Sequence, residues 1–279
     1  MARDLRRIKL VLLDLDGTVY LGHRLLPGAR EFFRRLAHAG IAHALLTNNS
    51  SIGPDDYLRK LRTLGLKADR RAVITSAESA VLMLRHHAVR PDRLFVLGTG
   101  KLVRYVQRCG FGNASDRADA VLVGFDKELT YEKLTRACHL IRRGATLYAT
   151  HPDVNCPMPE GAIPDAGSLL ALIRASTGVR PRDVAGKPHR WIVKVAQSHF
   201  GLKAGQMMVI GDRLDTDVRL ANRFGLASVL ISKAEKGSRK ARPRRYQPDL
   251  TVSNLAELIR TPFFRRLTGD KKGRQSSPP

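Results

Sequence analysis

The stretch VLLDLDGTVYLG, residues 11–22, decides how the chain folds. It begins as an apolar run typical of a buried strand and then places Asp14 and Asp16 just before the turn at Gly17. Because successive side chains of a strand alternate between its faces, the two carboxylates point roughly the same way. Two like charges in one small volume indicate a bound cation or separate tasks in a reaction. A plain surface turn of the Asp-Gly type is the alternative that this stretch leaves open.

Apolar runs alternate with segments of helical period in the first and last parts of the chain. We expect strands at residues 8–16, 41–49, 207–212 and 226–232, and helices near residues 28–39, 54–64 and 215–223. This order predicts an α/β fold with a Rossmann-like, doubly wound parallel sheet. In such a sheet, functional residues lie just beyond the carboxyl ends of strands, where Asp14, Thr47 and Asp212 are placed.

The middle of the chain carries a second set of alternating elements. Strands are expected at residues 93–98, 119–124 and 145–150, with helices near residues 101–109, 130–142 and 167–177. About 95 residues suffice for a layer with its own small core. We therefore expect an α/β cap domain at residues 89–183 inserted into a catalytic core at residues 1–88 and 184–262. The basic segment at residues 263–279 is short of apolar side chains, and we expect it to be disordered.

Composition limits the partners and the compartment. Lys and Arg number 49 against 25 Asp and Glu, a net charge of +24 that attracts anions without saying which. Three cysteines without a CxxC pair indicate free thiols and a reducing, cytoplasmic compartment. The longest stretch without a formal charge, residues 36–54, is too polar to span a bilayer, so we expect no membrane partner.

Four short motifs together supply what is needed to handle a phosphate with a hard cation: DLDGT at 14–18, TNNSS at 47–51, GKP at 186–188 and GDRLDTD at 211–217. Asp14 and Asp212 offer the carboxylate oxygens that Mg²⁺ prefers. Lys187 offers a positive charge, and Thr47 with the backbone after it offers hydrogen bonds to phosphate oxygens. Each motif alone also fits a helix cap or an exposed loop, but four together at strand ends favour the reactive site.

These residues resemble the haloacid dehalogenase (HAD) superfamily of phosphatases. More narrowly, the chain is similar to subfamily IIA, whose large α/β cap lies between the second and third motifs, as in p-nitrophenyl phosphatases, nucleotide monophosphatases, phosphoglycolate phosphatase and pyridoxal phosphate phosphatase. The match runs from LVLLDLDGTVYLG through YATHPDVNCPMPEGAIPDAGSL and AGKP to VIGDRLDTDV and PDLTVSNLAEL. Only the two ends of the chain fall outside it.

The resemblance implies a role for each residue of the motifs. Asp14 would attack phosphorus and form an aspartyl phosphate, while Asp16 would protonate the leaving oxygen and then activate water. Mg²⁺ would be held by the Asp14 carboxylate, the backbone carbonyl of Asp16, and Asp212, and Asp217 would orient the metal shell.

The phosphate-binding and substrate-binding roles follow from the same resemblance. Thr47, with the backbone of Asn48 and Asn49, would hold the phosphoryl oxygens while Lys187 neutralises their charge. The cap loop from about residue 150 to residue 167 would touch the leaving group through His151 and Cys156. His151 and the PDAGS turn with Asp165 and Ala166 depart from the pattern of many relatives, and Cys156 replaces a histidine of the pyridoxal phosphate branch. Packing or loop roles for His151 and Cys156 remain open.

The expected function is therefore Mg²⁺-dependent hydrolysis of small soluble phosphate monoesters: sugar phosphates, phosphoglycolate or nucleoside monophosphates. A cap of this size restricts access by polymers, so nucleic acids and phosphoproteins are poor substrates. The alternative is a non-catalytic polyanion-binding protein that uses a HAD scaffold and basic residues near 233–245 and 265–274. The resemblance also allows a homodimer.

Overall fold

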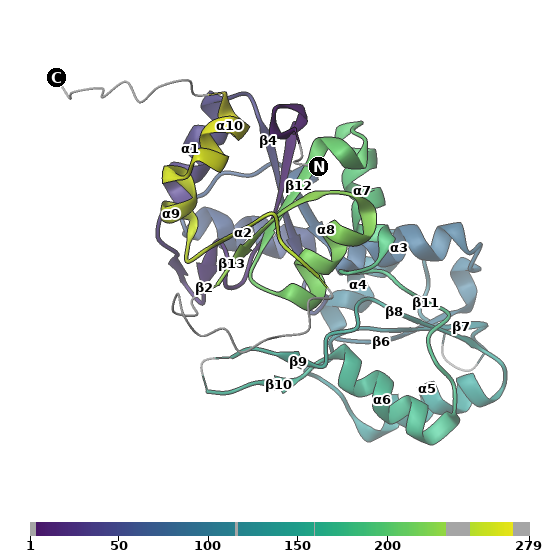
Figure 1. The fold of residues 1–279 in the computed structure, drawn as a ribbon. Coiled ribbons are helices and arrows are strands. Elements are labelled where there is room, and N and C mark those ends of the chain that lie inside the picture. The colour runs from purple at the N-terminus through teal and green to yellow at the C-terminus, as the bar shows by residue number, and fades with distance from the viewer. Residues whose placement is uncertain (1–3, 115–116, 159, 233–245, 270–279) are drawn as a thin grey trace. The chain divides into compact units, whose positions relative to one another are not determined.

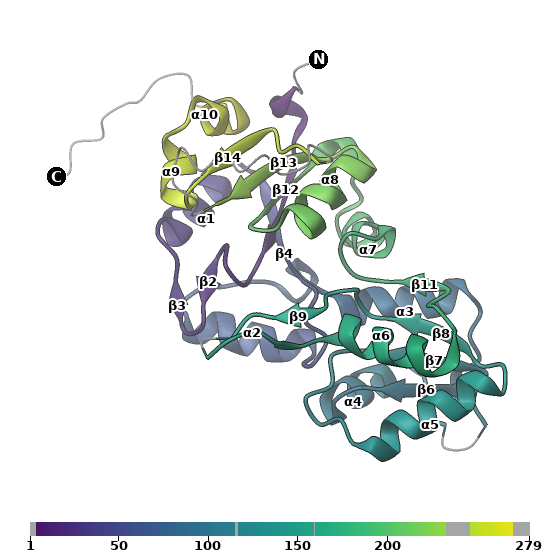
Figure 2. The same cartoon turned by 60° about the horizontal axis from the view of Figure 1, so that its bottom comes forward.

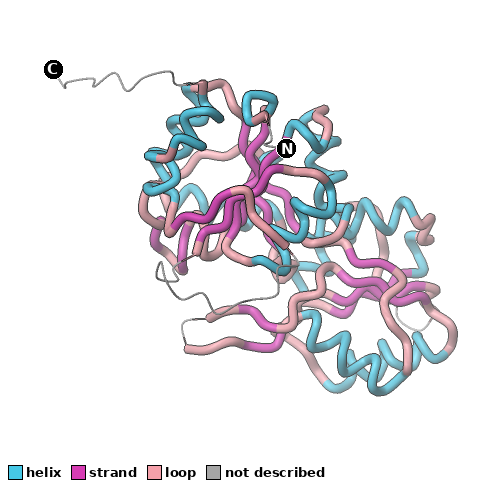
Figure 3. Tube along the Cα trace, in the orientation of Figure 1, coloured by secondary structure: helices cyan, strands magenta, loops and turns pink. Residues whose placement is uncertain are grey.

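The computed structural model describes residues 4–114, 117–158, 160–232 and 246–269. Strands and helices alternate along the chain and the strands of its two larger sheets are parallel, which confirms the predicted doubly wound α/β fold. The chain divides into two compact units, residues 1–45 with 200–279 and residues 46–199. Figure 3 shows the strands of both sheets flanked by helices.

In the described residues, the larger sheet has six strands in the order β14-β13-β12-β1-β4-β5. Its strands are β1 (Leu10–Asp14), β4 (Ala42–Thr47), β5 (Val73–Thr75), β12 (Met207–Gly211), β13 (Ala227–Ile231) and β14 (Leu250–Val252). β1 pairs in parallel with β12, with Leu10 opposite Met207 and Leu13 opposite Ile210. All four apolar residues of β1 are buried, as expected for a strand covered on both faces.

Helices cover both faces of this sheet in the first unit. Figures 1 and 2 show α1, α9 and α10 on one side and α8 on the other. Their bounds are α1 (Ala29–His38), α8 (Arg219–Phe224), α9 (Leu255–Arg260) and α10 (Pro262–Thr268). A small hairpin of β2 (Tyr20–Leu21) and β3 (Arg24–Leu25) follows β1, and 3₁₀ turns lie at η1 (Leu5–Arg7) and η4 (Ala204–Gln206).

The helix expected near residues 215–223 has two parts. A π-helical turn, η5 (Leu214–Val218), comes first and continues directly into α8. The amphipathic pattern of the sequence indicated a helix but could not distinguish i→i+5 from i→i+4 bonding. Such π turns often mark functional sites, and this one carries Asp217.

The expected disorder of residues 263–279 is wrong at its beginning. Pro262 opens α10, and Phe263, Phe264 and Leu267 are buried. The Phe264 ring packs against Phe32 of α1 with ring centroids 5.4 Å apart. A low average apolar content hid three large side chains on one helical face, which suffice to dock a short helix. Residues 270–279 lie outside the described residues.

The second unit contains a four-stranded parallel sheet in the order β11-β8-β7-β6. Its strands are β6 (Leu94–Leu97), β7 (Ala120–Val123), β8 (Thr146–Ala149) and β11 (Asp183–Val184), and β9 (Asn155–Cys156) pairs antiparallel with β10 (Ile163–Pro164). The helices are α2 (Pro54–Thr63), α3 (Ser76–His86), α4 (Gly100–Arg108), α5 (Tyr131–Arg142), α6 (Ala166–Thr177) and α7 (Arg190–Phe200). 3₁₀ turns lie at η2 (Arg70–Ala72) and η3 (Pro91–Arg93).

Alternating residues of this sheet build two cores. One face packs against α5 and α6 through Phe95, Leu97, Val121, Val123 and Leu147. The opposite face packs against α3 and α4 through Leu94, Val96, Ala120, Leu122 and Tyr148. The alternation of the two sets is the period of a strand buried on both sides. One of these faces packs against α3, which lies in the range that the sequence predicted to belong to the catalytic core.

Two composition-based expectations can be compared with the structure. No disulfide joins Cys109, Cys138 and Cys156, as their spacing indicated. Among the described residues, no helix combines the length and apolarity that crossing a bilayer requires.

Of the basic segments considered for polyanion binding, residues 233–245 and 270–274 lie outside the described residues.

Candidate functional site

Three carboxylates of the first unit gather at the carboxyl ends of neighbouring strands. Asp14 is the last residue of β1, Asp212 directly follows β12, and Asp217 lies in the π-helical turn η5. One oxygen from each lies within 4.8 Å of the others. The strand-end rule therefore predicted this cluster, because parallel pairing of β1 with β12 brings their ends to one edge.

Two glycines permit this close approach. Gly17 has a φ of +90°, and a Cβ there would lie 2.2 Å from Asp212 Oδ2. A Cβ on Gly211 would lie 2.2 Å from Cγ of Asp217. Both distances are far below van der Waals contact, so neither position accepts a larger residue without moving a carboxylate of the cluster.

The burial of the three carboxylates is graded. Asp212 is exposed, Asp14 is half-buried and Asp217 is buried. Asp217 Oδ2 accepts hydrogen bonds from the Arg213 N–H at 3.3 Å and from the Thr216 hydroxyl at 3.3 Å, which fix its orientation. Three oxygen ligands with like charge at this spacing suit a hard divalent cation, which removes their mutual repulsion. The donor set therefore fits Mg²⁺.

Asp16 lies outside this cluster of side-chain oxygens. Its backbone forms an isolated bridge with Tyr20, and the Gly17 N–H donates to the Tyr20 carbonyl at 2.9 Å. The turn that follows β1 is thereby held in place, with Asp16 exposed two residues beyond Asp14.

In the second unit, the segment after β4 is a compact polar turn. The Asn49 N–H donates to Thr47 Oγ1 at 3.1 Å. Asn49 Oδ1 accepts from the Ser51 N–H at 2.9 Å and from the Ser51 hydroxyl at 2.7 Å. Thr47 Oγ1 accepts this hydrogen bond, and a hydroxyl group that accepts one can still donate its own hydrogen to an anion.

The structure brings Asn48 and Lys187 together across 139 residues of sequence. The Lys187 N–H donates to Asn48 Oδ1 at 2.7 Å, and Asn48 Nδ2 donates to the Lys187 carbonyl at 3.0 Å. The same Nδ2 donates to Asp153 Oδ2 at 3.0 Å. Lys187, which precedes a cis proline, is 2% exposed and is not the solvated loop lysine that remained open from sequence.

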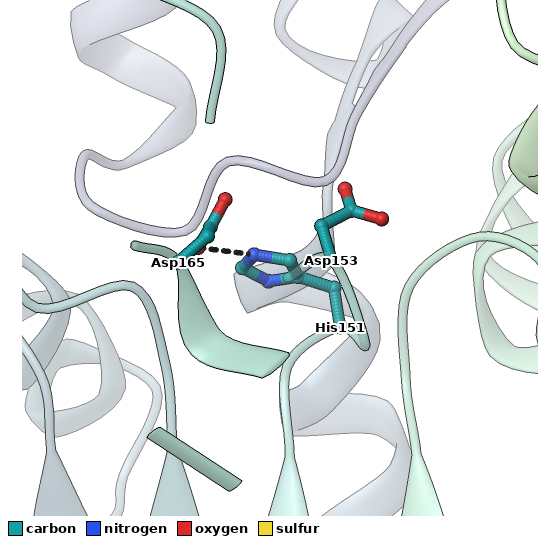
Figure 4. Close-up of side chains that lie close together, drawn as sticks. All are labelled: His151, Asp153 and Asp165. Atoms are coloured by element: carbon teal, nitrogen blue, oxygen red, sulfur yellow. Dashed lines mark hydrogen bonds and ion pairs between the residues drawn. The ribbon is translucent and has the colours of Figure 1, made fainter. Parts of the chain in front are cut away.

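His151 is fully buried, with both ring nitrogens bonded. Nδ1 lies 2.8 Å from the Thr150 hydroxyl, and Nε2 lies 2.8 Å from Asp165 Oδ1 (Figure 4). Asp165 Oδ1 also accepts from the Ala166 N–H at 2.6 Å. These contacts favour the packing role that the sequence left open for this histidine.

His151, Asp153 and Asp165 also lie close enough to one another to be considered as a metal site. The histidine nitrogens and Asp165 Oδ1 are committed to hydrogen bonds, and in Figure 4 the Asp153 carboxylate extends away from the bonded pair. We interpret the three residues as part of a buried hydrogen-bond network. Cys156 lies on β9, opposite Ile163.

Sequence reasoning missed Asp153 and Asp165 as members of this network. The signal was present in the polar residues of a loop rich in Pro and Gly, residues 151–167. Their partners, however, lie on other segments, and only the tertiary fold brings the side chain of Asn48 to Asp153.

Models of two families match the chain. The model described as haloacid dehalogenase-like hydrolase matches residues 11–112, and the one described as HAD-hydrolase-like matches residues 184–258. Residues 113–183 lie between the two matches.

Curated and structurally solved relatives cover nearly the whole chain. An acid sugar phosphatase of Staphylococcus aureus is 30% identical over 256 residues, which cover 91% of this chain and 98% of the relative. A 4-nitrophenylphosphatase structure from Thermotoga maritima is 42% identical, covers 93% of this chain and 99% of its own, and has a TM-score of 0.86. A glycerol phosphate phosphatase from Mycobacterium tuberculosis, in complex with calcium, is 32% identical over 92% of this chain and 76% of its own, with a TM-score of 0.80.

Proposed function

The chain belongs to the haloacid dehalogenase-like hydrolases and is a phosphatase of that superfamily, and on this premise we propose that it hydrolyses small phosphate monoesters with Mg²⁺ through an aspartyl phosphate. The observation that carries the proposal is the cluster of Asp14, Asp212 and Asp217. The cluster places Asp14, the nucleophile implied by the resemblance, within an oxygen-rich cation site at the end of β1.

Asp14, Asp212 and Asp217 would hold the cation, together with the backbone carbonyl of Asp16. When bound there, Mg²⁺ supplies positive charge that offsets the repulsion between an anionic substrate and an anionic nucleophile. The calcium complex of the glycerol phosphate phosphatase supports a divalent cation in this superfamily, and the hard oxygen donors of this chain favour Mg²⁺.

Asp14 would attack phosphorus and expel the alkoxide or phenoxide, forming a bond from its carboxylate oxygen to phosphorus. Asp16 would give its proton to the leaving oxygen and then take a proton from the water that attacks the phosphoenzyme. Dividing these tasks explains why two carboxylates stand two residues apart at the end of β1. Release of inorganic phosphate regenerates the Asp14 carboxylate.

Thr47, Lys187 and the backbone N–H groups of Asn48 and Asn49 would bind the phosphoryl oxygens. Thr47 is the last residue of β4, and functional residues of parallel sheets lie at such strand ends, which supports this assignment. The ammonium of a buried lysine is a strong local charge because little water screens it.

We assign substrate choice to an inserted cap at residues 89–183. The four-stranded sheet of the second unit supports an inserted layer, and the second family match, which begins at residue 184, supports its end at residue 183. Cys156 remains the candidate for contact with the leaving group. Relatives named for sugar phosphate, glycerol phosphate and nitrophenyl phosphate favour a small ester, in a reducing compartment such as the cytoplasm.

The test is phosphate release from p-nitrophenyl phosphate, glycerol phosphate, sugar phosphates and nucleoside monophosphates, with and without Mg²⁺. We expect turnover that requires the cation and falls at least about a thousandfold in Asp14→Asn. Asp215→Asn is the matched control, because the Asp215 carboxylate is 70% exposed and bonds to Arg213 outside the cluster. Equal turnover by Asp14→Asn and wild type would refute the proposal.

A further inference from the structure

We propose that the carboxamide of Asn48 is a positioning group that fixes the main chain of Lys187 and couples it to the loop at residues 150–167. The inference rests on the proposed function, in which Lys187 neutralises phosphate charge and the loop contributes to substrate choice. It gives the Asn48 side chain a task separate from the phosphate contact of its backbone N–H.

The first support is the two-point pairing between Asn48 and Lys187. The planar carboxamide accepts from the Lys187 N–H at 2.7 Å and donates to the Lys187 carbonyl at 3.0 Å. Both residues are buried, so neither bond exchanges readily with water. Such pairing fixes the position and the rotation of the backbone from which the lysine side chain extends.

The second support is that one carboxamide serves two segments. An amide nitrogen has two hydrogens, and the other one is directed to Asp153 Oδ2 at 3.0 Å. Asn48 is itself anchored, because its carbonyl accepts from the Ser76 hydroxyl at the start of α3. The side chain therefore links Lys187 and Asp153 to a point held by a helix.

Gly186 permits this arrangement. A Cβ at that position would lie 2.5 Å from Asn48 Oδ1, 2.9 Å from His151 Cβ and 2.9 Å from the Thr150 carbonyl. The chain thus approaches both the carboxamide and the base of the loop at a spacing that only glycine allows without displacement.

The base of the loop is rigid enough to transmit a displacement. Ser50 Oγ lies 3.0 Å from Thr150 Oγ1, which bonds His151, which in turn bonds Asp165. The Gly167 N–H donates to the Asp153 carbonyl at 2.7 Å. Both ends of the loop are therefore bonded, and Asp153 cannot move without straining the carboxamide that holds Lys187.

A double-mutant cycle distinguishes positioning from general stabilisation. We expect Asn48→Ala to lower kcat/KM for p-nitrophenyl phosphate by about 10- to 100-fold and to weaken the binding of inorganic phosphate measured by calorimetry. Because the effect passes through Lys187, Asn48→Ala/Lys187→Ala should lose no more than Lys187→Ala alone. Gly186→Ala should reproduce the Asn48→Ala defect.

Asn222→Ala is the matched control. Asn222 makes the same pair of bonds with the main chain of Gln247, at 3.0 and 2.9 Å, on an exposed part of the first unit. It should leave kcat/KM and phosphate affinity unchanged.

If Asn48→Ala does not fold, Asn48→Asp keeps the acceptor for the Lys187 N–H but loses both donors. Adding Asp153→Asn should then restore part of its activity, because a donor returns to that contact.

Additive losses in the cycle, or wild-type kcat/KM and phosphate affinity in Asn48→Ala, would overturn the inference. A wild-type protein that turns over none of the esters would refute the proposed function instead. In that case phosphate affinity alone decides the inference: a double variant that binds phosphate no more weakly than Lys187→Ala supports it, and additive weakening refutes it.

Discussion

At the scale of single residues, Gly17 limits how the carboxylate cluster can be built. We expect Gly17→Ala to reduce the free energy of unfolding by about 1–2 kcal/mol, because the positive φ at this position is strained for a residue with a Cβ. The new Cβ would also displace Asp212 and weaken Mg²⁺ binding. Urea unfolding and calorimetric titration with Mg²⁺ measure the two effects.

Gly205→Ala is the control for that change, because a Cβ on Gly205 meets no atom of the described part of the chain within 4 Å. It should leave cation affinity unaltered. Equal cation affinity in Gly17→Ala and wild type would show that Asp212 does not depend on the close approach at Gly17.

Glu78, in the first turn of α3, makes stability depend on pH. Burial raises the pKa of its carboxyl above the ordinary value, and the nearby Arg70 and His199 oppose the rise only in part. Its Oε2 atom is buried and has no hydrogen-bond partner among the described residues. A raised pKa in the folded state means that this group's stabilisation is complete below the unfolded pKa of about 4.3 and is lost as pH rises through the folded pKa.

We therefore expect the free energies of unfolding of wild type and Glu78→Gln to change differently with pH. On going from pH 7 to pH 4, wild type should gain about 1 kcal/mol relative to the variant, the scale of one unsatisfied buried polar group. Urea unfolding at both pH values gives the comparison. A difference that does not vary with pH would show that Glu78 is not the titrating group.

The sequence predicted the residues at strand ends and missed the residues that connect distant loops. Asp14, Thr47 and Asp212 follow apolar runs, and that local signal places them at the edge of a parallel sheet. The bonds from the Asn48 side chain to Asp153 and Lys187 span 105 and 139 residues, and no local pattern reports them.

At the scale of elements, periodicity predicted many of the helices and strands, but α3, α7 and α9 were not among the expected helices although each buries apolar side chains. The helix expected near residues 54–64 is α2 (Pro54–Thr63), opened by a proline in its first turn. The π-helical turn and α10 were missed for a common reason. Both depend on tertiary packing of a few side chains, which the average composition of a segment does not reveal.

The helix α10 provides a test at this scale. We expect Phe264→Ala to reduce the free energy of unfolding by about 3–5 kcal/mol, because the ring is 1% exposed and packs against Phe32. Leu21→Ala, at a side chain that is 57% exposed, should change it by less than about 0.5 kcal/mol. Similar losses in both variants, measured by urea unfolding, would refute docking of α10 through this face.

At the scale of the whole molecule, the family matches and the α/β fold both indicate a HAD hydrolase. No short motif of the sequence identifies the physiological substrate. Residues 11–112 and 184–258 match HAD models, and the residues between them, 113–183, fall within the range that we assign to the cap. A net charge of +24 favours anionic substrates in general and selects none of them. In our proposal, substrate choice depends on the loop at residues 150–167, whose shape and contacts composition does not describe.

The most direct test of the account is to trap the phosphoenzyme. Wild type and Asp14→Asn are mixed with excess p-nitrophenyl phosphate and Mg²⁺, quenched with acid during turnover, digested and analysed by mass spectrometry. We expect the mass of one HPO₃ on the wild-type peptide that contains Asp14, and no such addition in the variant. Turnover with the added mass on another residue, or undiminished turnover by Asp14→Asn, would contradict the account.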